Sequence, residues 1–288
     1  MTNIGEAIEL GTSVLTEIGQ SVPRLDAQVL LGHVLHVDRA TLIAHPEIHL
    51  TGEQEQQYQR LLERRKRGEP VAYIVGHKEF FGLDFFVDRR VLIPRPETEL
   101  LVEIVLKIIR DLLASGLTPV VADIGTGSGV IPIALAVQEP RLPYVYATDI
   151  SLDALDVARL NCQRYAVEHR VHLLHGDLLT PLPEPVDVLT ANLPYVGFDE
   201  MDQLASDVRA YEPHLALISG TQGLDLLERF FKEAQRSGKL KEHAVLIMEI
   251  GYQQREILVH LLHELWPQAT VTSEKDYASW DRLLKVIL

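Results

Sequence analysis

The chain has 288 residues, of which 47% are hydrophobic and 24% charged, a composition typical of globular proteins with ample material for a core. This length exceeds that of most single domains, and the net charge of -14 argues against a large nucleic-acid-binding surface. The lone cysteine, Cys162, excludes an internal disulfide. The first residues show no secretory signal, and no apolar run reaches the roughly 20 residues of a membrane span, so we expect a cytoplasmic protein.

The first part of the chain is predicted to be helical. Apolar residues recur at helical spacing from Ile4 to Ile18, and Pro23 opens a second helix. A third helix is expected from the N-cap Thr51, with Gln54 three residues later, to Gly68. No strand pattern interrupts residues 1–75, so we predict a small helical domain there. The basic run at residues 64–67 is interpreted as a solvated helix end.

The character of the sequence changes after Glu69-Pro70. Aromatic residues, β-branched residues and glycines dominate from Val71 to Ile93, which predicts a hairpin or an extended linker. Pro94-Arg95-Pro96 ends this stretch, and a helix is expected from Glu97 to Leu113. We therefore assign residues 76–95 to a hairpin linker and residues 96–288 to a second domain.

Apolar strands alternate with helices from Pro119 onward. The predicted strands are 120–124, 145–148, 171–174, 186–190 and 245–249, and the predicted helices are 130–137, 152–165, 224–236 and 254–265. This alternation indicates an α/β fold with a parallel sheet covered by helices on both faces. Residues 269–272 and 283–287 form two more short strands without a helix between them, so they should make an antiparallel edge pair.

A glycine-rich loop connects the first of these strands to the next helix. Asp123 and Ile124 end the strand and Gly125, Thr126, Gly127, Ser128 and Gly129 form the loop. Glycines allow a tight turn and close approach of a ligand to the backbone. The dinucleotide fingerprint needs a third glycine at a fixed spacing, but Val130 or Pro132 stands there. The Asp123 carboxylate would repel a pyrophosphate and attract an ammonium group, such as that of S-adenosylmethionine.

Acidic residues also follow the next two strands. Asp149 stands twenty residues after Gly129, where a carboxylate can accept hydrogen bonds from both ribose hydroxyls. Asp177, with Leu178 beside it, is placed to approach the adenine edge. A glycine loop with acids at three successive strand ends predicts an S-adenosylmethionine site. The competing interpretation is that these acids only cap helices, since Ser151 after Asp149 is itself a good N-cap.

The tetrapeptide Asn192-Leu193-Pro194-Tyr195 follows the fourth strand directly. Two acceptors, the Asn192 side-chain oxygen and a main-chain carbonyl, would grip the two N–H groups of a planar amide or amine. Tyr195 would stack on the flat group. We predict that Asn192 and Tyr195 are catalytic, that all four residues bind the acceptor, and that Asn192 also borders the donor. Positioning would supply most of the rate, and no metal is needed.

Taken together, these motifs resemble the peptide chain release factor N5-glutamine methyltransferases over almost the whole chain. The resemblance rests on the segments 68–70, 73–74, 76, 79–80, 82–83, 91–99, 149–151, 192–195, 211–213 and 276–278 and on the glycine loop. The run from Val91 to Glu99 discriminates best, because adenine methyltransferases in general lack it. Two positions depart from the family pattern: Leu193 replaces a proline, and Ser279 replaces a frequent glycine. Since Leu193 still supplies a carbonyl and Pro194 keeps it extended, the grip should survive.

The resemblance implies a seven-stranded, Rossmann-like class I methyltransferase domain. It also implies methylation of the glutamine in the Gly-Gly-Gln motif of release factors, with S-adenosyl-L-homocysteine as the second product. The helical N-terminal domain would help to recognise the release factor, and Phe80 and Phe81 would wall the donor pocket. We expect a monomer without direct nucleic-acid contact.

Three alternatives remain open at this stage. A ribosomal-protein glutamine would require the same chemistry. An adenine amino group of nucleic acid is disfavoured by charge, because residues 1–75 carry ten acids and seven bases (net -3), which leaves -11 for the remainder. A non-enzymatic adaptor with a vestigial donor pocket is opposed by the intact glycine loop, Asp149 and Asn192.

Overall fold

The computed structural model describes residues 2–276 and 278–288, so Tyr277, part of one segment of the resemblance, lies outside the described residues. The chain forms two compact units. One comprises residues 2–77 and Ala205–Tyr211, and the other comprises Lys78–Leu204 and Glu212–Leu288. Within the described ranges, no helix has the length and apolarity needed to cross a membrane.

The first unit is helical, as predicted. Its helices are α1 (Ile4–Glu17), α2 (Pro23–Leu35), α3 (Arg39–Ala44), α4 (Gly52–Lys66), α5 (Val71–Val75) and α9 (Ser206–Tyr211). The predicted cap of α4 is confirmed: Thr51 and Gln54 form a reciprocal capping box. Leu15, Leu30 and Leu31 are fully buried between these helices and form the centre of the unit's core.

Three features of the first unit differ from the sequence-based predictions. The short helices α3 and α9 were not predicted, and α5 occupies residues 71–75, the start of the stretch predicted to be a hairpin or an extended linker. α5 forms because Pro70 precedes it, Gly76 ends it in the left-handed conformation, and Ile74 and Val75 are buried in the helical core. The basic run is also not wholly solvated, since the Arg65 side chain is only 7% exposed. For α5 and for Arg65, burial in the tertiary structure outweighed the local preference of the sequence.

The predicted hairpin is confirmed further along. Strands β1 (His77–Phe80) and β2 (Leu83–Phe86) form a separate two-stranded sheet. Phe81 and Gly82 connect them with φ of 53° and 73°, as a tight hairpin turn requires. Phe80 is buried and meets Phe85 edge to face, with ring centroids 6.1 Å apart.

The second unit contains the predicted seven-stranded sheet, in the order β5-β4-β3-β6-β7-β9-β8. Its strands are β3 (Val121–Ile124), β4 (Val145–Asp149), β5 (Val171–His175), β6 (Val186–Ala191), β7 (Leu240–Glu249), β8 (Thr270–Lys275) and β9 (Asp281–Ile287). The first five are parallel, whereas β9 pairs antiparallel with both β7 and β8. The predicted antiparallel edge pair is therefore confirmed, and β7 begins five residues earlier than predicted.

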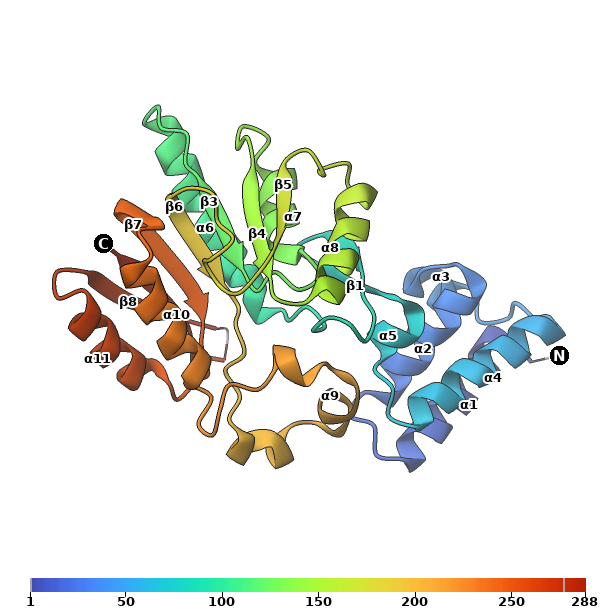
Figure 1. The fold of residues 1–288 in the computed structure, drawn as a ribbon. Helices are drawn as coiled ribbons and strands as arrows, with labels where there is room; N and C mark the ends of the chain where they lie inside the picture. The colour runs from blue at the N-terminus through green and yellow to red at the C-terminus, as the bar shows by residue number, and fades with distance from the viewer. Residues whose placement is uncertain (1, 277) are drawn as a thin grey trace. The chain divides into compact units, whose positions relative to one another are not determined.

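Helices cover both faces of this sheet (Figure 1). α6 (Glu97–Ala114), α7 (Val130–Gln138) and α8 (Leu152–Arg164) pack on one face, while α10 (Asp225–Arg236) and α11 (Arg255–Leu265) pack on the other. Adjacent strand residues alternate between the faces: Val121 belongs to the first core and Ala122 to the second. Two short 3-10 helices, η1 (Phe198–Gln203) and η2 (His214–Ala216), lie between β6 and α10 in the chain and were not predicted.

Candidate functional site

A cavity opens at the carboxyl ends of the parallel strands, where ligands of open α/β sheets bind. It lies entirely within the second unit, and its empty space is about 1150 Å³, counting the part open to solvent. The sequence-predicted residues that line it are Gly125, Thr126, Gly127, Ser128, Asp149, Asp177, Leu178, Asn192, Leu193 and Pro194. Of the other three, Asp123 lies buried behind the glycine loop, Gly129 caps α7 and Tyr195 is mostly buried beside the cavity.

The glycine loop packs directly against the tetrapeptide. Gly125 has a φ of 73°, and a Cβ on it would lie 2.8 Å from Cδ2 of Leu193. A side chain at Gly125 would therefore strain the backbone and displace Leu193. Leu193 is itself only 4% exposed. Its side chain thus fills the space between the loop and the end of β6, a contact that the sequence did not reveal.

Asp123, buried behind the loop, and Thr126 within it each carry a polar atom without a hydrogen-bond partner among the described residues. Asp123 is fully buried, and its Oδ1 accepts a hydrogen bond from Thr190 Oγ1 at 2.7 Å. Its Oδ2 and Thr126 Oγ1 are the buried side-chain oxygen or nitrogen atoms without a hydrogen-bond partner in the described part of the chain. Burial raises the pKa of the Asp123 carboxyl to about 7, against the lowering effects of the hydrogen bond from Thr190 and of the nearby Thr126 hydroxyl. Buried polar atoms are rarely left unsatisfied, so these two are suited to an external partner.

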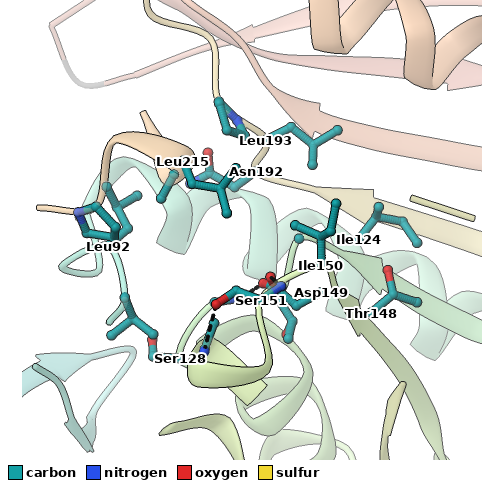
Figure 2. Close-up of a pocket in the computed structure, with 18 of the residues that line it drawn as sticks. Leu92, Ile124, Ser128, Thr148, Asp149, Ile150, Ser151, Asn192, Leu193 and Leu215 are labelled. Carbon is teal, nitrogen blue, oxygen red and sulfur yellow. Dashed lines mark hydrogen bonds between the residues drawn. The ribbon is translucent and has the colours of Figure 1, made fainter. Parts of the chain in front are cut away.

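Asp149 ends β4 and is held by the main chain. Gly127 N–H donates to its Oδ2 at 2.8 Å, and Ser151 N–H donates to its Oδ1 at 2.9 Å. These bonds fix the carboxylate at the cavity wall while each oxygen retains a further lone pair. Burial raises the pKa of Asp149, partly offset by these backbone hydrogen bonds. Figure 2 shows Asp149 and Ser151 across the cavity from Asn192 and Leu215.

Asp177 is paired with an arginine that the sequence analysis did not identify. Both carboxylate oxygens accept from Arg229 on α10, at 2.5 and 2.9 Å, and both residues line the cavity. Leu178, which follows, has a φ of 45° and accepts a hydrogen bond from Thr148 Oγ1. Asp177 therefore lines the cavity with its charge already balanced by Arg229.

Asn192 belongs to a chain of hydrogen bonds at the end of β6. Its Nδ2 donates to Thr98 Oγ1 at 3.0 Å, and Thr98 Oγ1 donates to Glu249 Oε2 at 2.7 Å. Tyr195 Oη donates to the other oxygen, Glu249 Oε1, at 2.9 Å. Ala191 pairs with Met248, so Asn192 and Glu249 follow at neighbouring strand ends. Thr98 and Glu249 were not identified from the sequence, although Thr98 lies in the discriminating run.

The same run forms one wall of the cavity. Leu92, Pro94 and Arg95 line it, and Arg95 pairs with Glu212 at 2.6 Å. Glu212 also accepts the Ile93 N–H at 3.1 Å, which anchors this wall to the segment before η2. Phe80 and Phe81 are not among the lining residues described here; they pack with the core instead.

The arrangement suits a ligand with a cationic end, a diol and a flat apolar part. Asp123 offers an unmatched carboxylate, Asp149 offers oriented acceptors, and Ile150 and Leu215 add apolar surface. These groups fit the ammonium, ribose and adenine of S-adenosylmethionine. Among residues 2–276 and 278–288, no group of three or more His, Cys, Asp and Glu side chains is placed to hold a metal ion.

Two family models match the sequence. Residues 6–76 match the PrmC N-terminal domain, and residues 98–208 match the methyltransferase small domain. Solved structures with similar folds include the hMettl16 catalytic domain in complex with the MAT2A 3'UTR hairpin 1, with a TM-score of 0.55 and 14% identity over 82% of this chain and 80% of that one. The delta-N METTL16 MTase domain has a TM-score of 0.52 and 17% identity over 73% and 90%. These likenesses establish the methyltransferase fold alone.

Curated relatives are similar over nearly the whole chain. The release factor glutamine methyltransferase of Bacillus anthracis is 36% identical over 97% of both chains. That of Chlorobaculum tepidum is 43% identical over 90% of this chain and 88% of its own, and that of Koribacter versatilis is 42% identical over 80% of both. The chain therefore belongs to the release factor glutamine methyltransferase family, whose methyl donor is S-adenosylmethionine.

Proposed function

We propose that this methyltransferase modifies the side-chain amide nitrogen of the glutamine in the Gly-Gly-Gln motif of peptide chain release factors. Family membership over 97% of the chain is the observation that carries the proposal. The intact cavity supports it, because its polar groups fit the donor and Asn192 stands at its edge.

The donor's position follows from the charges and acceptors around the cavity. We assign its ammonium group to Asp123, its ribose hydroxyls to Asp149 and its adenine to the region of Asp177 and Leu178. The backbone of Gly125, Thr126, Gly127, Ser128 and Gly129 would lie along the donor's methionine part. S-adenosylmethionine supplies a methyl group on a positively charged sulfur, which departs as a neutral thioether.

The acceptor amide would be gripped by the tetrapeptide. Asn192 donates its Nδ2 to Thr98, so its Oδ1 is left to accept one N–H of the substrate glutamine. A main-chain carbonyl of Leu193 or Pro194 would accept the other. A delocalised amide nitrogen is a poor nucleophile, so holding it in line with the methyl carbon supplies most of the rate. The carbon–nitrogen bond forms as the carbon–sulfur bond breaks, and the amide proton leaves to water.

The substrate assignment is tested with purified release factor and labelled donor. Release factor with Gly-Gly-Gln should be labelled, and the matched protein with Gly-Gly-Ala should not. Equal labelling of both would contradict the glutamine assignment. Stronger labelling of a ribosomal protein than of release factor would favour that rival substrate.

Asn192→Ala tests the grip on the acceptor. Losing the oriented acceptor should lower kcat by roughly 100-fold, because a misplaced amide seldom reaches the methyl carbon. Donor affinity, measured by calorimetry with S-adenosylhomocysteine, should change little. Unchanged turnover in this variant would contradict the proposed grip.

We further propose that the enzyme acts in the cytoplasm, where release factors work on ribosomes, and that it acts as a monomer. The net charge of -14 supports recognition of the protein substrate without direct nucleic-acid contact. Sedimentation of the enzyme alone and with release factor would reveal a dimer if one forms.

A further inference from the structure

Thr98 and Glu249 lie one and two hydrogen bonds behind Asn192; Thr98 also lines the cavity, whereas Glu249 is not among the lining residues that the structure describes. Thr98 is 2% exposed at the start of α6, and Glu249 is 1% exposed at the end of β7. Such buried polar groups need a reason, because burying a carboxylate is costly unless its hydrogen bonds are satisfied. Here both oxygens of Glu249 are occupied, one by the Thr98 hydroxyl and one by the Tyr195 hydroxyl.

The direction of each hydrogen bond follows from the chemistry of the groups. In its ionised form the Glu249 carboxylate can only accept, so Thr98 uses its single proton on Glu249. Burial raises the pKa of Glu249, and the hydrogen bonds that Thr98 and Tyr195 donate to the ionised form lower it. The Thr98 oxygen then has only lone pairs left, and it must accept from Asn192. The amide of Asn192 therefore presents Nδ2 to Thr98, and its Oδ1 is the atom left for the substrate.

We propose that Thr98 and Glu249 are positioning residues that fix the orientation of the Asn192 amide and of the Tyr195 ring. This inference rests on the proposed function and deepens it. If the Asn192 amide rotated by half a turn, an N–H donor would face the substrate N–H groups, and the two would repel. The oxygen and nitrogen ends of an amide have nearly the same shape, so packing alone cannot choose between them. The hydroxyl of Thr98 makes that choice, and the carboxylate of Glu249 sets the direction of the hydroxyl.

Two substitutions at Thr98 separate the hydroxyl from the shape of the side chain. Thr98→Val keeps the shape and removes the hydrogen bond, so kcat should fall by about 10- to 100-fold while affinity for S-adenosylhomocysteine stays near the wild-type value. Thr98→Ser keeps the hydroxyl and should restore most of the turnover. Full activity in Thr98→Val, or equal losses in Val and Ser, would overturn the proposal.

Glu249→Gln provides an independent test of the proposal. The neutral amide contains a donor, so one of the two hydroxyls, Thr98 or Tyr195, would have to turn away. We expect a loss of kcat of similar size without loss of donor affinity. A Glu249→Gln enzyme with wild-type kcat would show that the carboxylate does not set the direction of these hydrogen bonds.

A spectroscopic readout does not depend on turnover. The chain has three asparagines, Asn3, Asn161 and Asn192, so asparagine-selective labelling resolves three side-chain amide groups, each with a pair of N–H signals. Asn161 is buried and its Nδ2 donates to Phe86 O and Ser128 O, which makes it an internal reference. Thr98→Val should accelerate hydrogen exchange of the Asn192 amide alone, and Thr98→Ser should not. Unchanged exchange at Asn192 in Thr98→Val would contradict the proposal, whereas an inactive wild-type enzyme would instead contradict the proposed function.

Discussion

Asp123 holds a carboxylate in a fully buried position with one oxygen unpartnered, in the described structure. Burial raises its pKa to about 7, whereas an unfolded Asp titrates near 3.8. Between these values the folded state binds the extra proton, so the contribution of Asp123 to stability falls as pH rises from about 3.8 to about 7 and is constant above pH 7. The group is therefore costly to the free protein when charged, and a bound ammonium group would relieve that cost.

The donor affinity should depend on pH through Asp123. Below pH 7 the carboxyl is protonated and must lose its proton to pair with an ammonium group. Affinity for S-adenosylhomocysteine should thus fall by up to about tenfold per pH unit as pH drops below 7, with release of a proton on binding. Calorimetry in two buffers with different ionisation enthalpies measures both effects.

Asp123→Asn provides the matched control for this dependence. The neutral variant should bind the donor more weakly at pH 8 and lose most of the pH dependence. It should also unfold at a higher temperature than wild type at pH 8, because the unpartnered charge is gone. A variant that binds as tightly as wild type would contradict the assignment of Asp123 to the ammonium group.

Residues at strand ends were the most predictable part of the site. A carboxyl strand end in a parallel sheet is a binding edge, and that rule placed Asp149, Asp177 and Asn192 on the cavity wall. The same rule applies to Glu249, which closes a predicted strand, so a sequence signal for it existed. Thr98 and Arg229 had no such signal, because their roles depend on where helices α6 and α10 bring them.

The departure at Ser279 has a backbone explanation. Ser279 has a φ of 66°, in the left-handed region that favours glycine. Its N–H donates to Asp276 O in the turn before β9. The glycine that the family resemblance leads one to expect there would relieve strain in this turn, so the departure affects the turn and not the cavity.

At the scale of elements, long periodic segments were predictable and short ones were not. The strands and helices of the sheet were assigned correctly because each has a sustained apolar pattern. α3 and α9 have six residues each, and α5 has five, so their formation depends on tertiary contacts. The lengthened start of β7 escaped prediction because residues 240–243 are mostly polar and exposed.

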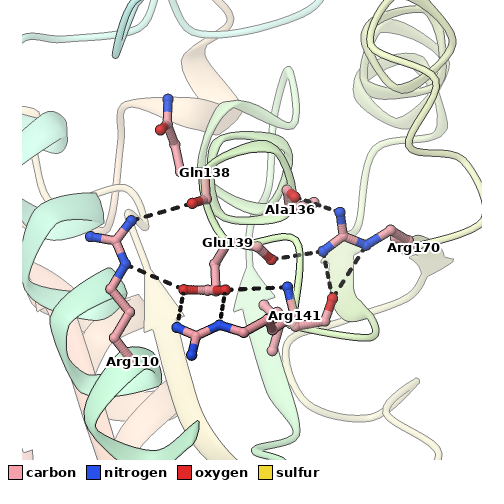
Figure 3. Close-up of polar contacts among 7 residues, drawn as sticks. Arg110, Ala136, Gln138, Glu139, Arg141 and Arg170 are labelled. Carbon is pink, nitrogen blue, oxygen red and sulfur yellow. Dashed lines mark hydrogen bonds and ion pairs between the residues drawn. The ribbon is translucent and has the colours of Figure 1, made fainter. Parts of the chain in front are cut away.

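The end of α7 shows how charged side chains fix an element whose beginning carries the glycine loop. Arg170 donates to the carbonyls of Ala136 in the last turn of the helix and of Glu139 at its C-cap (Figure 3). It also donates to the Leu142 carbonyl beyond the helix. The Glu139 carboxylate accepts from Arg141 at 2.8 Å and from Arg110 at 3.3 Å. The hydrogen bonds from Arg170 to the backbone satisfy carbonyls at the end of the helix that have no partner within the helix. Gly129, the last residue of the glycine loop, caps the opposite end of α7, so the anchored helix adjoins the loop directly.

Glu139 should make the protein sensitive to acid. The hydrogen bonds from Arg141 are the main reason that its pKa is lowered to about 2, from an ordinary value of 4.5. Since the folded pKa is depressed, its stabilisation is complete above pH 4.5 and is lost as pH falls toward 2. At pH 6 the free energy of unfolding of wild type should exceed that of Glu139→Gln by on the order of 1 kcal/mol. The difference is no larger because the arginine partners are exposed and solvent screens their charges. Urea denaturation from pH 6 to pH 3 should show that this difference becomes smaller. A difference that stays constant would contradict the attribution of the stabilisation to the lowered pKa of Glu139.

At the scale of the whole molecule, the sequence predicted a helical region followed by an α/β region, but the division of the chain is not linear. Residues 205–211, which follow the tetrapeptide in sequence, belong to the first unit. Within that unit, Tyr211 Oη donates to Arg67 O at 2.9 Å. No local pattern could reveal this, because the partners are 144 residues apart.

Arg65 is the buried cation that fastens this segment within the first unit. Its guanidinium pairs with Asp26 at 2.8 Å and with Asp207 at 3.3 Å, and it donates to Gln20 and to Glu69 O. Removing one partner of a buried ion pair leaves an uncompensated charge, here that of Asp26, whose pKa burial already raises. The effect should be confined to the first unit, because the cavity residues all belong to the second.

Arg65→Met should therefore separate recognition from donor binding. We expect a loss of about 3–5 kcal/mol in stability of the first unit and faster hydrogen exchange at residues 206–211. Affinity for S-adenosylhomocysteine should stay near wild type, whereas KM for release factor should rise if the helical unit recognises it. Lys66→Met, at an exposed position one residue further along α4, is the matched control and should change neither quantity. Unaltered exchange at residues 206–211 in Arg65→Met would show that Arg65 does not fasten the segment, and an unaltered KM despite faster exchange would place recognition elsewhere.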